Sequence, residues 1–358
     1  MTRRFAFYLA IVIMGVGASW ALSPNELSSQ QQVTVQIDND DIGGVVRSSK
    51  GPEAGVWVIA ETTDLPTRFT RAVVTDDQGR YVLPDLPKAT YNIWVRGYGL
   101  VDSPKVKSTP GKNLNLRAVV APDEAAAAKY YPAIYWYSMM QIPDKSEFGG
   151  KGAIPGKITQ TEWINTMKSN GCVGCHQMGQ TSTRTFPKEI PYPIKMPTSQ
   201  EAWFRRIQSG QSGESMFNTT VKNLGGAPIK YFADWTDRIA KGELPHAKPP
   251  RPQGVERNIV VTTWDWFDEK KYLHDLISSD RRFPTVNSYG PLYGSAEYSG
   301  DGLPILDPKT HTVRTFQAPV RDANTPEALG PGHAASDKLM QPSPYWGSEK
   351  IWDTKANN

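Results

Sequence analysis

The most restrictive feature of this sequence is its pair of cysteines. The chain of 358 residues contains two of them, Cys172 and Cys175, and His176 follows directly. Exported proteins use cysteines for disulfides, but a bridge stabilises a fold mainly when it closes a long loop. Cysteines three positions apart are too close in sequence for that purpose. The pair therefore needs a chemical explanation.

The segment Cys172-Val173-Gly174-Cys175-His176 matches the C-x-x-C-H signature of covalent haem attachment. Two thiols on one turn of chain meet the two vinyl groups of one porphyrin edge, and His176 then stands under the iron as the proximal ligand. A redox dithiol would follow a strand in a βαβ context, which is absent here. A zinc site would need further ligands at suitable spacing, and His246 and His274 lie far away in sequence. We expect one covalent haem c.

Helical periodicity begins just before the motif and continues after it. Apolar residues recur at three- and four-residue steps in three segments, 160–170, 199–209 and 228–241. The order of helix, motif, helix, loop and final helix resembles the class I cytochrome c family. That resemblance implies a small all-α cytochrome c domain over residues 160–245, with its last helix packed on its first.

The same resemblance implies a distal methionine in the loop before the last helix, and Met216 lies at that position. A thioether ligand fills the sixth site and raises the potential, which favours electron transfer over oxygen chemistry. Met216 is followed by phenylalanine, whereas the family has proline. Met196 is the second candidate, and a histidine or an open site stays as a further alternative. Met178 is too close to His176 to reach the opposite haem face, and Met167 suits the helix core.

Aromatic residues recur along the second and third helices. Four of them could line a haem pocket or belong to an ordinary core: Trp203, Phe204, Tyr231 and Trp235. Because the haem is itself the core of so small a domain, the pattern favours neither interpretation.

Residues 41–122 have the pattern of an all-β sandwich. Short apolar runs alternate with turn residues, and the turn at Asp76–Gly79 between runs at 71–74 and 81–83 predicts a hairpin. Many short strands in one segment favour an antiparallel sandwich of the immunoglobulin or transthyretin type.

Four short stretches carry a resemblance to the carboxypeptidase regulatory-like, or transthyretin-like, sandwich family: Ile42-Gly43-Gly44-Val45-Val46, Gly55-Val56-Trp57-Val58, Thr75–Tyr81 and Leu86-Pro87. The resemblance implies a rigid accessory or binding module. The family is structurally akin to starch-binding domains, so a glycan is a possible ligand.

Residues 246–358 return to β structure. A strand is expected at 259–264, and a strand, turn and strand at 303–316, as in a propeller blade. A further strand is expected at 345–352. The segment resembles the opening of a streptogramin-lyase-like or NHL-type propeller. A closed propeller needs at least four blades, so we expect an incomplete propeller, in a fragment of a longer protein or in a chain held by a partner.

Three polar residues of this region have plain expected roles. Asp307 belongs to a turn, and His311 and His333 are surface residues without partners. No catalytic constellation is visible there.

The N-terminus has the pattern of a secretory signal peptide over residues 1–21: Arg3-Arg4, an apolar run at 5–16 and a small-x-small site ending at Ala21. The alternative, an uncleaved anchor, is disfavoured because spanning a bilayer takes about 20 apolar residues. A polar linker at 22–40 and a bridging segment at 123–159, rich in aromatic residues, complete the organisation. We expect a periplasmic or secreted protein without a membrane span after cleavage.

The charge balance points away from a nucleic-acid partner. Lysine and arginine number 40 against 36 acidic residues, with Arg3 and Arg4 removed on cleavage.

The haem motif favours an electron-transfer protein, with a redox partner protein, over a stand-alone enzyme. Two alternatives stay open. One is an oxidoreductase or lyase whose catalytic site lies in the propeller, and the other is a carbohydrate-binding protein with an accessory cytochrome.

Overall fold

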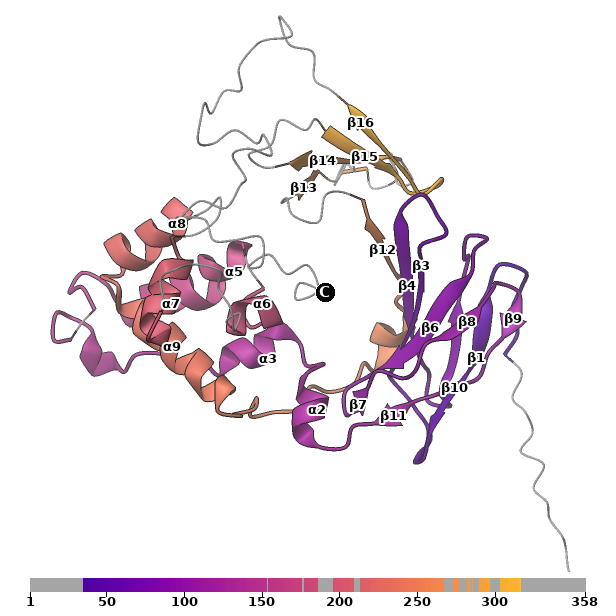
Figure 1. Cartoon of the computed structure of the whole chain (residues 1–358), viewed down its shortest axis with the longest axis horizontal. Helices are drawn as coiled ribbons and strands as arrows, with labels where there is room; N and C mark the ends of the chain where they lie inside the picture. Colours follow the sequence, from indigo (N-terminus) through magenta and orange to yellow (C-terminus); the bar gives the residue numbers. More distant parts are fainter. Residues whose placement is uncertain are drawn as a thin grey trace, which may run out of the picture. The chain divides into compact units, whose positions relative to one another are not determined.

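The computed structural model describes residues 35–316, with gaps at 153, 176, 186–195, 209–212, 267–272, 277–281, 284, 286–289 and 297–302 (Figure 1). It consists of N-terminal β-sheets, a central helical region and a small C-terminal sheet. The predicted signal peptide, the predicted strand at 345–352 and His333 lie outside the described residues. No helix within the described ranges is long and apolar enough to cross a membrane.

The first N-terminal sheet is organised around β1 (Ile42–Ser48). This strand pairs antiparallel with β2 (Gly51–Pro52) and β5 (Arg80–Leu83), and parallel with β9 (Lys112–Asn113) and β10 (Leu116–Arg117). The first five residues of β1 are all buried. The strand therefore lies at the centre of the N-terminal core.

The second sheet has five strands in the order β12-β4-β3-β6-β8, each antiparallel to its neighbour. The bounds are β3 (Trp57–Thr62), β4 (Arg68–Val74), β6 (Tyr91–Arg96), β8 (Val106–Ser108) and β12 (Val261–Asp265), and a separate two-stranded pair is formed by β7 (Leu100–Val101) and β11 (Val119–Val120). Alternate residues of β3 are buried, as in a strand with one face on a core. Residues of both sheets, among them Ile42, Val58 and Phe69, join one apolar cluster, so the two sheets enclose a common core.

The turn predicted at Asp76–Gly79 is confirmed, but the hairpin predicted around it is wrong. The amide of Gly79 donates to the carbonyl of Asp76 at 3.0 Å, and Gly79 has a φ of 74°, which favours glycine. However, β4 lies in the second sheet and β5 pairs with β1 in the first. The turn carries the chain from one sheet to the other, because β3 and β12 already occupy both edges of β4.

The strand predicted at 259–264 is present as β12, but it does not open a C-terminal domain. It pairs with β4 along its whole length and so belongs to the sandwich. Without β12, the edge of β4 would expose unpaired backbone groups. The chain thus returns to the sandwich after the helical region.

The helical region is built from short elements. Their bounds are α2 (Glu124–Ala128), α3 (Ala133–Ser138), η1 (Lys145–Glu147), α4 (Gln160–Ile164), η2 (Asn165–Ser169), α5 (Cys172–Cys175), α6 (Thr181–Arg184), α7 (Ser199–Arg206), α8 (Gly213–Phe217), η3 (Asn218–Asn223) and α9 (Ala227–Ala240), and η4 (Gly254–Asn258) precedes β12. The three predicted helices are present as α4 with η2, α7 and α9. Thr159 and Thr198 cap α4 and α7, and Glu162 and Glu201 accept in return from the cap amides.

The aromatic bridge at 130–137 divides between two neighbours. Tyr131 contacts Tyr98 of the sandwich edge-on, with 6.1 Å between ring centroids. Trp136 and Tyr137 are instead buried in the core of the helical region. The bridging segment therefore contacts the sandwich through Tyr131 and contributes Trp136 and Tyr137 to the core of the helical region.

The C-terminal sheet is an antiparallel meander in the order β13-β14-β15-β16. Its strands are β13 (Leu273–Leu276), β14 (Leu292–Ala296), β15 (Leu303–Asp307) and β16 (Thr312–Phe316). The expected turn at Asp307 is confirmed, since its Oδ1 accepts from the amide of Lys309 at 2.8 Å. The described residues form this one sheet here and no propeller.

The expectation that His311 is a surface residue without partners is wrong. It adopts a φ of 56° at the tip between β15 and β16. Its Nδ1 accepts from Trp264 Nε1 at 3.0 Å, its carbonyl accepts from the Thr67 hydroxyl at 3.2 Å, and its ring lies edge-on to Phe69 at 5.0 Å. These partners come from strands distant in sequence, which a local pattern does not reveal.

Candidate functional site

Both cysteines lie in α5, a helix of four residues that follows η2 closely. In η2 the chain is wound more widely than in an α-helix. The amide of Asn170 donates to Asn165 O at 2.8 Å and that of Gly171 to Thr166 O at 3.1 Å, and each bond spans five residues. A Cβ at Gly171 would lie 2.5 Å from Thr166 O, so glycine is needed there. The two cysteine backbones consequently share one helical turn.

The Cys172 side chain is half-buried against the apolar core of the helical region. Its Sγ lies 3.9 Å from Sδ of the fully buried Met167. Burial, and secondarily the nearby Cys172, raises the pKa of Tyr137, whose hydroxyl donates to the carbonyl of Met167. The side chain of Cys175 and the whole of His176 lie outside the described residues, so their roles stay predictions.

The core beside Cys172 is aromatic. Trp163 of α4 lies edge-on to Tyr231 of α9, with 5.4 Å between ring centroids and an interplanar angle of 71°. Trp203 of α7 stacks on Phe232 at 4.5 Å, and its Nε1 donates to the Thr236 hydroxyl at 3.1 Å. The helix before the motif, α4, and the last helix, α9, are therefore in contact.

The four aromatic candidates for a pocket lining do not behave alike. Trp203, Tyr231 and Trp235 are buried in the core, but Phe204 is 44% exposed and meets Phe217 edge-on at 6.1 Å. Successive residues of a helix point about 100° apart, so Phe204 faces away when Trp203 faces inward. Phe204 is therefore not an ordinary core residue, and its place beside a haem stays a prediction.

Met216 lies in α8, and its side chain is half-buried against the same apolar core as Cys172. The hydroxyl of Thr220 donates to Met216 O at 2.7 Å, where α8 passes into η3. Met178 is buried in the core, and Met196 is half-buried just ahead of α7. Met216 and Cys172 thus border one core, which keeps Met216 as the first candidate for a distal ligand and Met196 as the second.

One buried donor in this core lacks an acceptor. The Trp163 side chain is fully buried, and its Nε1 has no hydrogen-bond partner among the described residues. A buried donor left unpaired costs about 1–3 kcal/mol. A bound group that presents an acceptor to Trp163 Nε1 would remove this cost.

Two cationic side chains near the motif, Lys168 and Arg184, contact backbone carbonyls and aromatic rings. The sequence alone does not distinguish them from lysines and arginines on the surface. Lys168 Nζ donates to two backbone carbonyls at 2.9 and 3.0 Å. Arg184 donates to Gly179 O at 2.5 Å, and its guanidinium lies 4.2 Å over the Trp136 ring. Burial lowers the pKa of Lys168 to about 8 and that of Arg184 to about 10. Each is a positive charge without a carboxylate partner within the described ranges.

These residues fit a covalent haem. The aromatic core can bury an apolar ring, the Cys172 thiol stands at its border, and the Met216 thioether borders the same core. A haem also carries two carboxylates, the kind of group that Trp163 and Arg184 lack. The cysteine sulfurs would bond to the porphyrin rather than to the iron, and a methionine thioether is a ligand that suits haem iron better than a hard cation.

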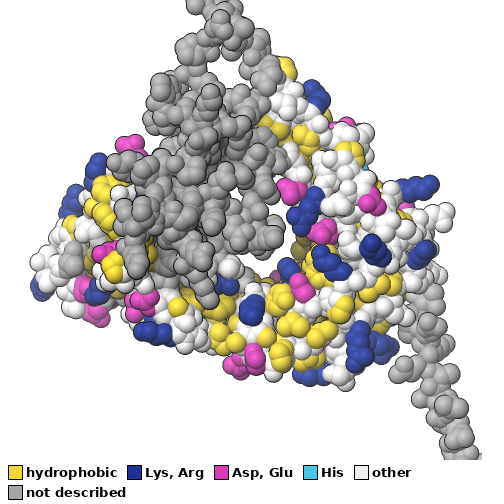
Figure 2. Space-filling model, viewed as in Figure 1, with side chains coloured by type: hydrophobic (Ala, Val, Ile, Leu, Met, Phe, Trp, Pro, Cys, Tyr) yellow, Lys and Arg dark blue, Asp and Glu magenta, His cyan; other side chains and the backbone are white. Residues whose placement is uncertain are grey.

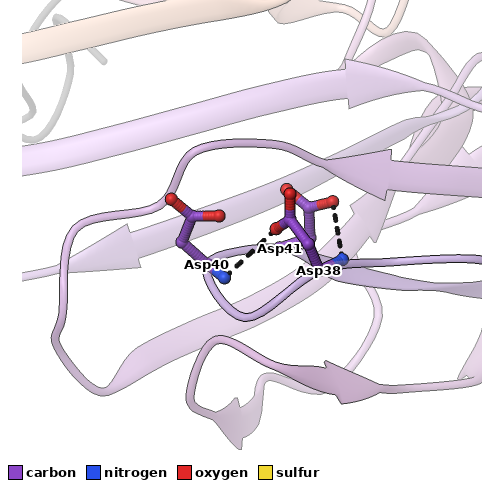
Figure 3. Close-up of side chains that lie close together, drawn as sticks. All are labelled: Asp38, Asp40 and Asp41. Carbon is purple, nitrogen blue, oxygen red and sulfur yellow. Dashed lines mark hydrogen bonds between the residues drawn. The ribbon is translucent and has the colours of Figure 1, made fainter.

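Three carboxylates that could share a cation lie elsewhere, at Asp38, Asp40 and Asp41 ahead of β1 (Figure 3). Asp41 accepts from the amide of Asp38 at 3.2 Å, and Asp38 accepts from that of Asp40 at 3.3 Å. Local turn hydrogen bonds explain why these side chains lie together.

No known protein family matches this chain, and no curated protein matches it at a significant level. The interpretation of the site therefore rests on the C-x-x-C-H motif and on the residues around it.

Proposed function

We propose that this protein transfers electrons through one haem bound covalently to Cys172 and Cys175. His176 serves as the proximal ligand and Met216 as the distal ligand, with Met196 as the second candidate. The observation that carries the proposal is the C-x-x-C-H motif, whose two cysteines lie on one helical turn, with Cys172 at the border of an aromatic core that Met216 also borders.

Attachment requires only the two thiols and the two vinyl groups of the porphyrin. Each thiol would add across a vinyl double bond, so that sulfur bonds to one carbon and hydrogen to the other, with no net oxidation. With His176 and Met216 as its two protein ligands, the haem would supply electron transfer rather than oxygen chemistry. The bound haem supplies a centre that gains and loses one electron. The buried aromatic residues exclude water from it.

The proposal extends to the three regions. The helical region is of the class I cytochrome c type, supported by the contact between Trp163 and Tyr231 and by the order of α4 with η2, α7 and α9. The sandwich is a carboxypeptidase regulatory-like accessory module. The C-terminal meander is a single propeller-type blade.

The proposed location is the periplasm or the exterior, because residues 1–21 have the composition of a signal peptide. The proposed partner is a redox protein. Lysine, arginine and acidic side chains intermingle on the visible described surface in Figure 2. Such a mixture differs from the basic stripe that nucleic-acid binding requires.

The test is an optical spectrum of the protein exported from a host with working haem-attachment machinery. Purified protein, oxidised and then reduced with dithionite, should give a c-type spectrum and pyridine haemochrome, and the haem should resist extraction by acid acetone. The double variant Cys172→Ala/Cys175→Ala should retain no haem after extraction. Colourless wild-type protein, or covalent haem in the double variant, would overturn the proposal.

Met216→Ala and Met196→Ala form a matched pair for the distal ligand. The first should keep covalent haem but lose the weak long-wavelength band of a ferric haem with methionine ligation. The second should keep both. The reverse result would assign the distal position to Met196.

A further inference from the structure

We propose that Lys168 binds and releases a proton in step with electron transfer at this site, so that the protein couples one electron to one proton. The inference rests on the proposed function. Reduction takes one electron from a one-electron donor protein and one proton from solvent, which converts the neutral amine of Lys168 to its ammonium form. Oxidation returns both.

The first support is position. Lys168 lies in η2, four residues ahead of Cys172, and its Nζ is 4.5 Å from the ring centroid of Tyr137. The hydroxyl of the same tyrosine donates to the carbonyl of Met167, whose Sδ is 3.9 Å from Cys172 Sγ. One aromatic ring thus separates the ammonium from the residues around the proposed attachment point.

The second support is the bonding of Nζ. Its acceptors are the carbonyls of Tyr137 and Met140, at 2.9 and 3.0 Å. Neutral acceptors hold an ammonium less tightly than carboxylates do. Burial correspondingly lowers the pKa of Lys168 to about 8. Both protonation states are therefore accessible near neutral pH, in contrast to an exposed lysine.

Among the described residues, the charged groups around Lys168 leave its charge uncompensated. On α3, Tyr137 stays neutral because burial raises its pKa. Next to Met140, Arg238 of α9 donates to Met139 O at 2.6 Å and pairs with Asp234 and Glu243 at 2.9 and 2.7 Å. On α5, Cys172 becomes a neutral thioether in the loaded protein. On α4, the Glu162 carboxylate bonds to Thr159 at the helix start.

The coupling follows from electrostatic reciprocity. A positive charge near the haem favours the reduced state, and the reduced state in turn holds the proton more tightly. Unit charges about 10 Å apart, at an effective dielectric constant of about 20, alter an equilibrium about 15-fold. Arg184 also adds positive charge, but burial lowers its pKa only to about 10, so it stays charged where Lys168 titrates.

The test is a potentiometric titration of the covalently loaded protein with redox mediators, from about pH 6 to about pH 10. In the wild type, the reduction equilibrium should weaken roughly five- to fifteenfold as pH rises through the titration of Lys168. Lys168→Arg should abolish this pH dependence and keep the larger reduction equilibrium constant at every pH, because arginine stays charged. Lys168→Gln should also abolish it, but should keep the smaller constant, because glutamine is neutral. Lys241→Gln, at an exposed lysine after α9, should follow the wild type.

Any pH dependence of the reduction equilibrium that remains in Lys168→Arg comes from other titrating groups. A Lys168→Arg profile equal to the wild type would overturn the proposal while leaving the haem spectrum, and hence the proposed function, intact. Absence of covalent haem would overturn both. If the variants fold poorly, proton uptake during reduction of the wild type, followed with a pH indicator, decides. A fractional proton per electron near pH 8 supports the proposal, and none at any pH contradicts it.

Discussion

The sandwich and the helical region differ in the partners of their least exposed charged groups. In the sandwich, the buried Glu53 carboxylate pairs with Arg251 at 2.5 Å. The hydroxyls of Tyr81 and Tyr91 donate to backbone carbonyls at 2.6 and 2.8 Å. In the helical region, Lys168, Arg184 and Trp163 Nε1 have no anionic partner among the described residues.

This difference accords with the proposed function, in which the helical region binds a further group. Two groups of the sandwich behave in the same way: Trp94 Nε1 is buried without a hydrogen bond, and the half-buried Arg71 donates to neutral oxygens of Pro84, Asp85 and Thr262. Near the motif the unmatched groups cluster, and they are cationic as well as neutral. Desolvated positive charge is costly without compensation. The helical region should therefore depend on the haem far more than the sandwich does.

The largest expected effect comes from removing both thiols. Cys172→Ala/Cys175→Ala should raise amide exchange across residues 160–240 by more than about tenfold, because an unfilled core opens locally. Exchange across 42–96 should change little. Hydrogen exchange followed by mass spectrometry measures both regions in one sample. Equal changes in the two would remove the proposed contrast.

The second effect should fall on the sandwich alone. Arg251→Ala should lower the free energy of unfolding by about 3 kcal/mol, because it leaves the Glu53 charge buried and unpaired. Asp77→Asn is the control, because this carboxylate is 75% exposed in its pair with Arg257. It should cost less than about 1 kcal/mol. Denaturant unfolding measures both, and the haem spectrum should not move in either.

The third effect tests the unpartnered donor in the helical core. Trp163 Nε1 has no acceptor among the described residues. If the haem supplies one, Trp163→Phe should cost about 1 kcal/mol more in loaded protein than in the cysteine double variant. Trp203→Phe should cost the same in both backgrounds, since Thr236 serves that donor throughout. An equal cost for Trp163→Phe in both backgrounds would mean that haem brings it no acceptor.

The smallest effect concerns the contact of His311 with the sandwich. Burial, then the charge of Arg71, lowers the pKa of His311 below 6.5, since its Nδ1 must stay unprotonated to accept from Trp264. The contact should be complete above pH 6.5 and weaken as pH falls through the lowered pKa, by less than about 1 kcal/mol.

Amide exchange at β15 and β16, corrected for its intrinsic pH dependence, measures this loss. His311→Asn tolerates the positive φ and cannot titrate, so its profile should be flat. His246→Asn, at an exposed histidine, should follow the wild type. A wild-type profile as flat as that of His311→Asn would show that the hydrogen bond does not control the contact.

Local features of this fold follow from the sequence. Asp76–Gly79 is a turn because its residue types fit no other conformation as well, and the helix after Thr198 begins where a capping box stands. Partners at long range do not follow. The pairing of β5 with β1 rather than β4 depends on which edges other strands already occupy.

The candidate site divides in the same manner. The spacing of Cys172 and Cys175 was sufficient to predict attachment chemistry, which stays a prediction. Nothing in the local sequence singles out Lys168. Burial lowers its pKa, and its acceptors are the carbonyls of Tyr137 and Met140, more than twenty residues upstream. Burial by distant segments is what single-sequence patterns do not contain.

The late arrival of β12 has a consequence for biogenesis. Synthesis begins at the N-terminus, and the proposed export does too, so residues 172–176 become accessible before the strand at Val261–Asp265 does. At that stage one border of β4 is still unpaired. The thiols are therefore accessible to the proposed haem attachment before the sandwich can close.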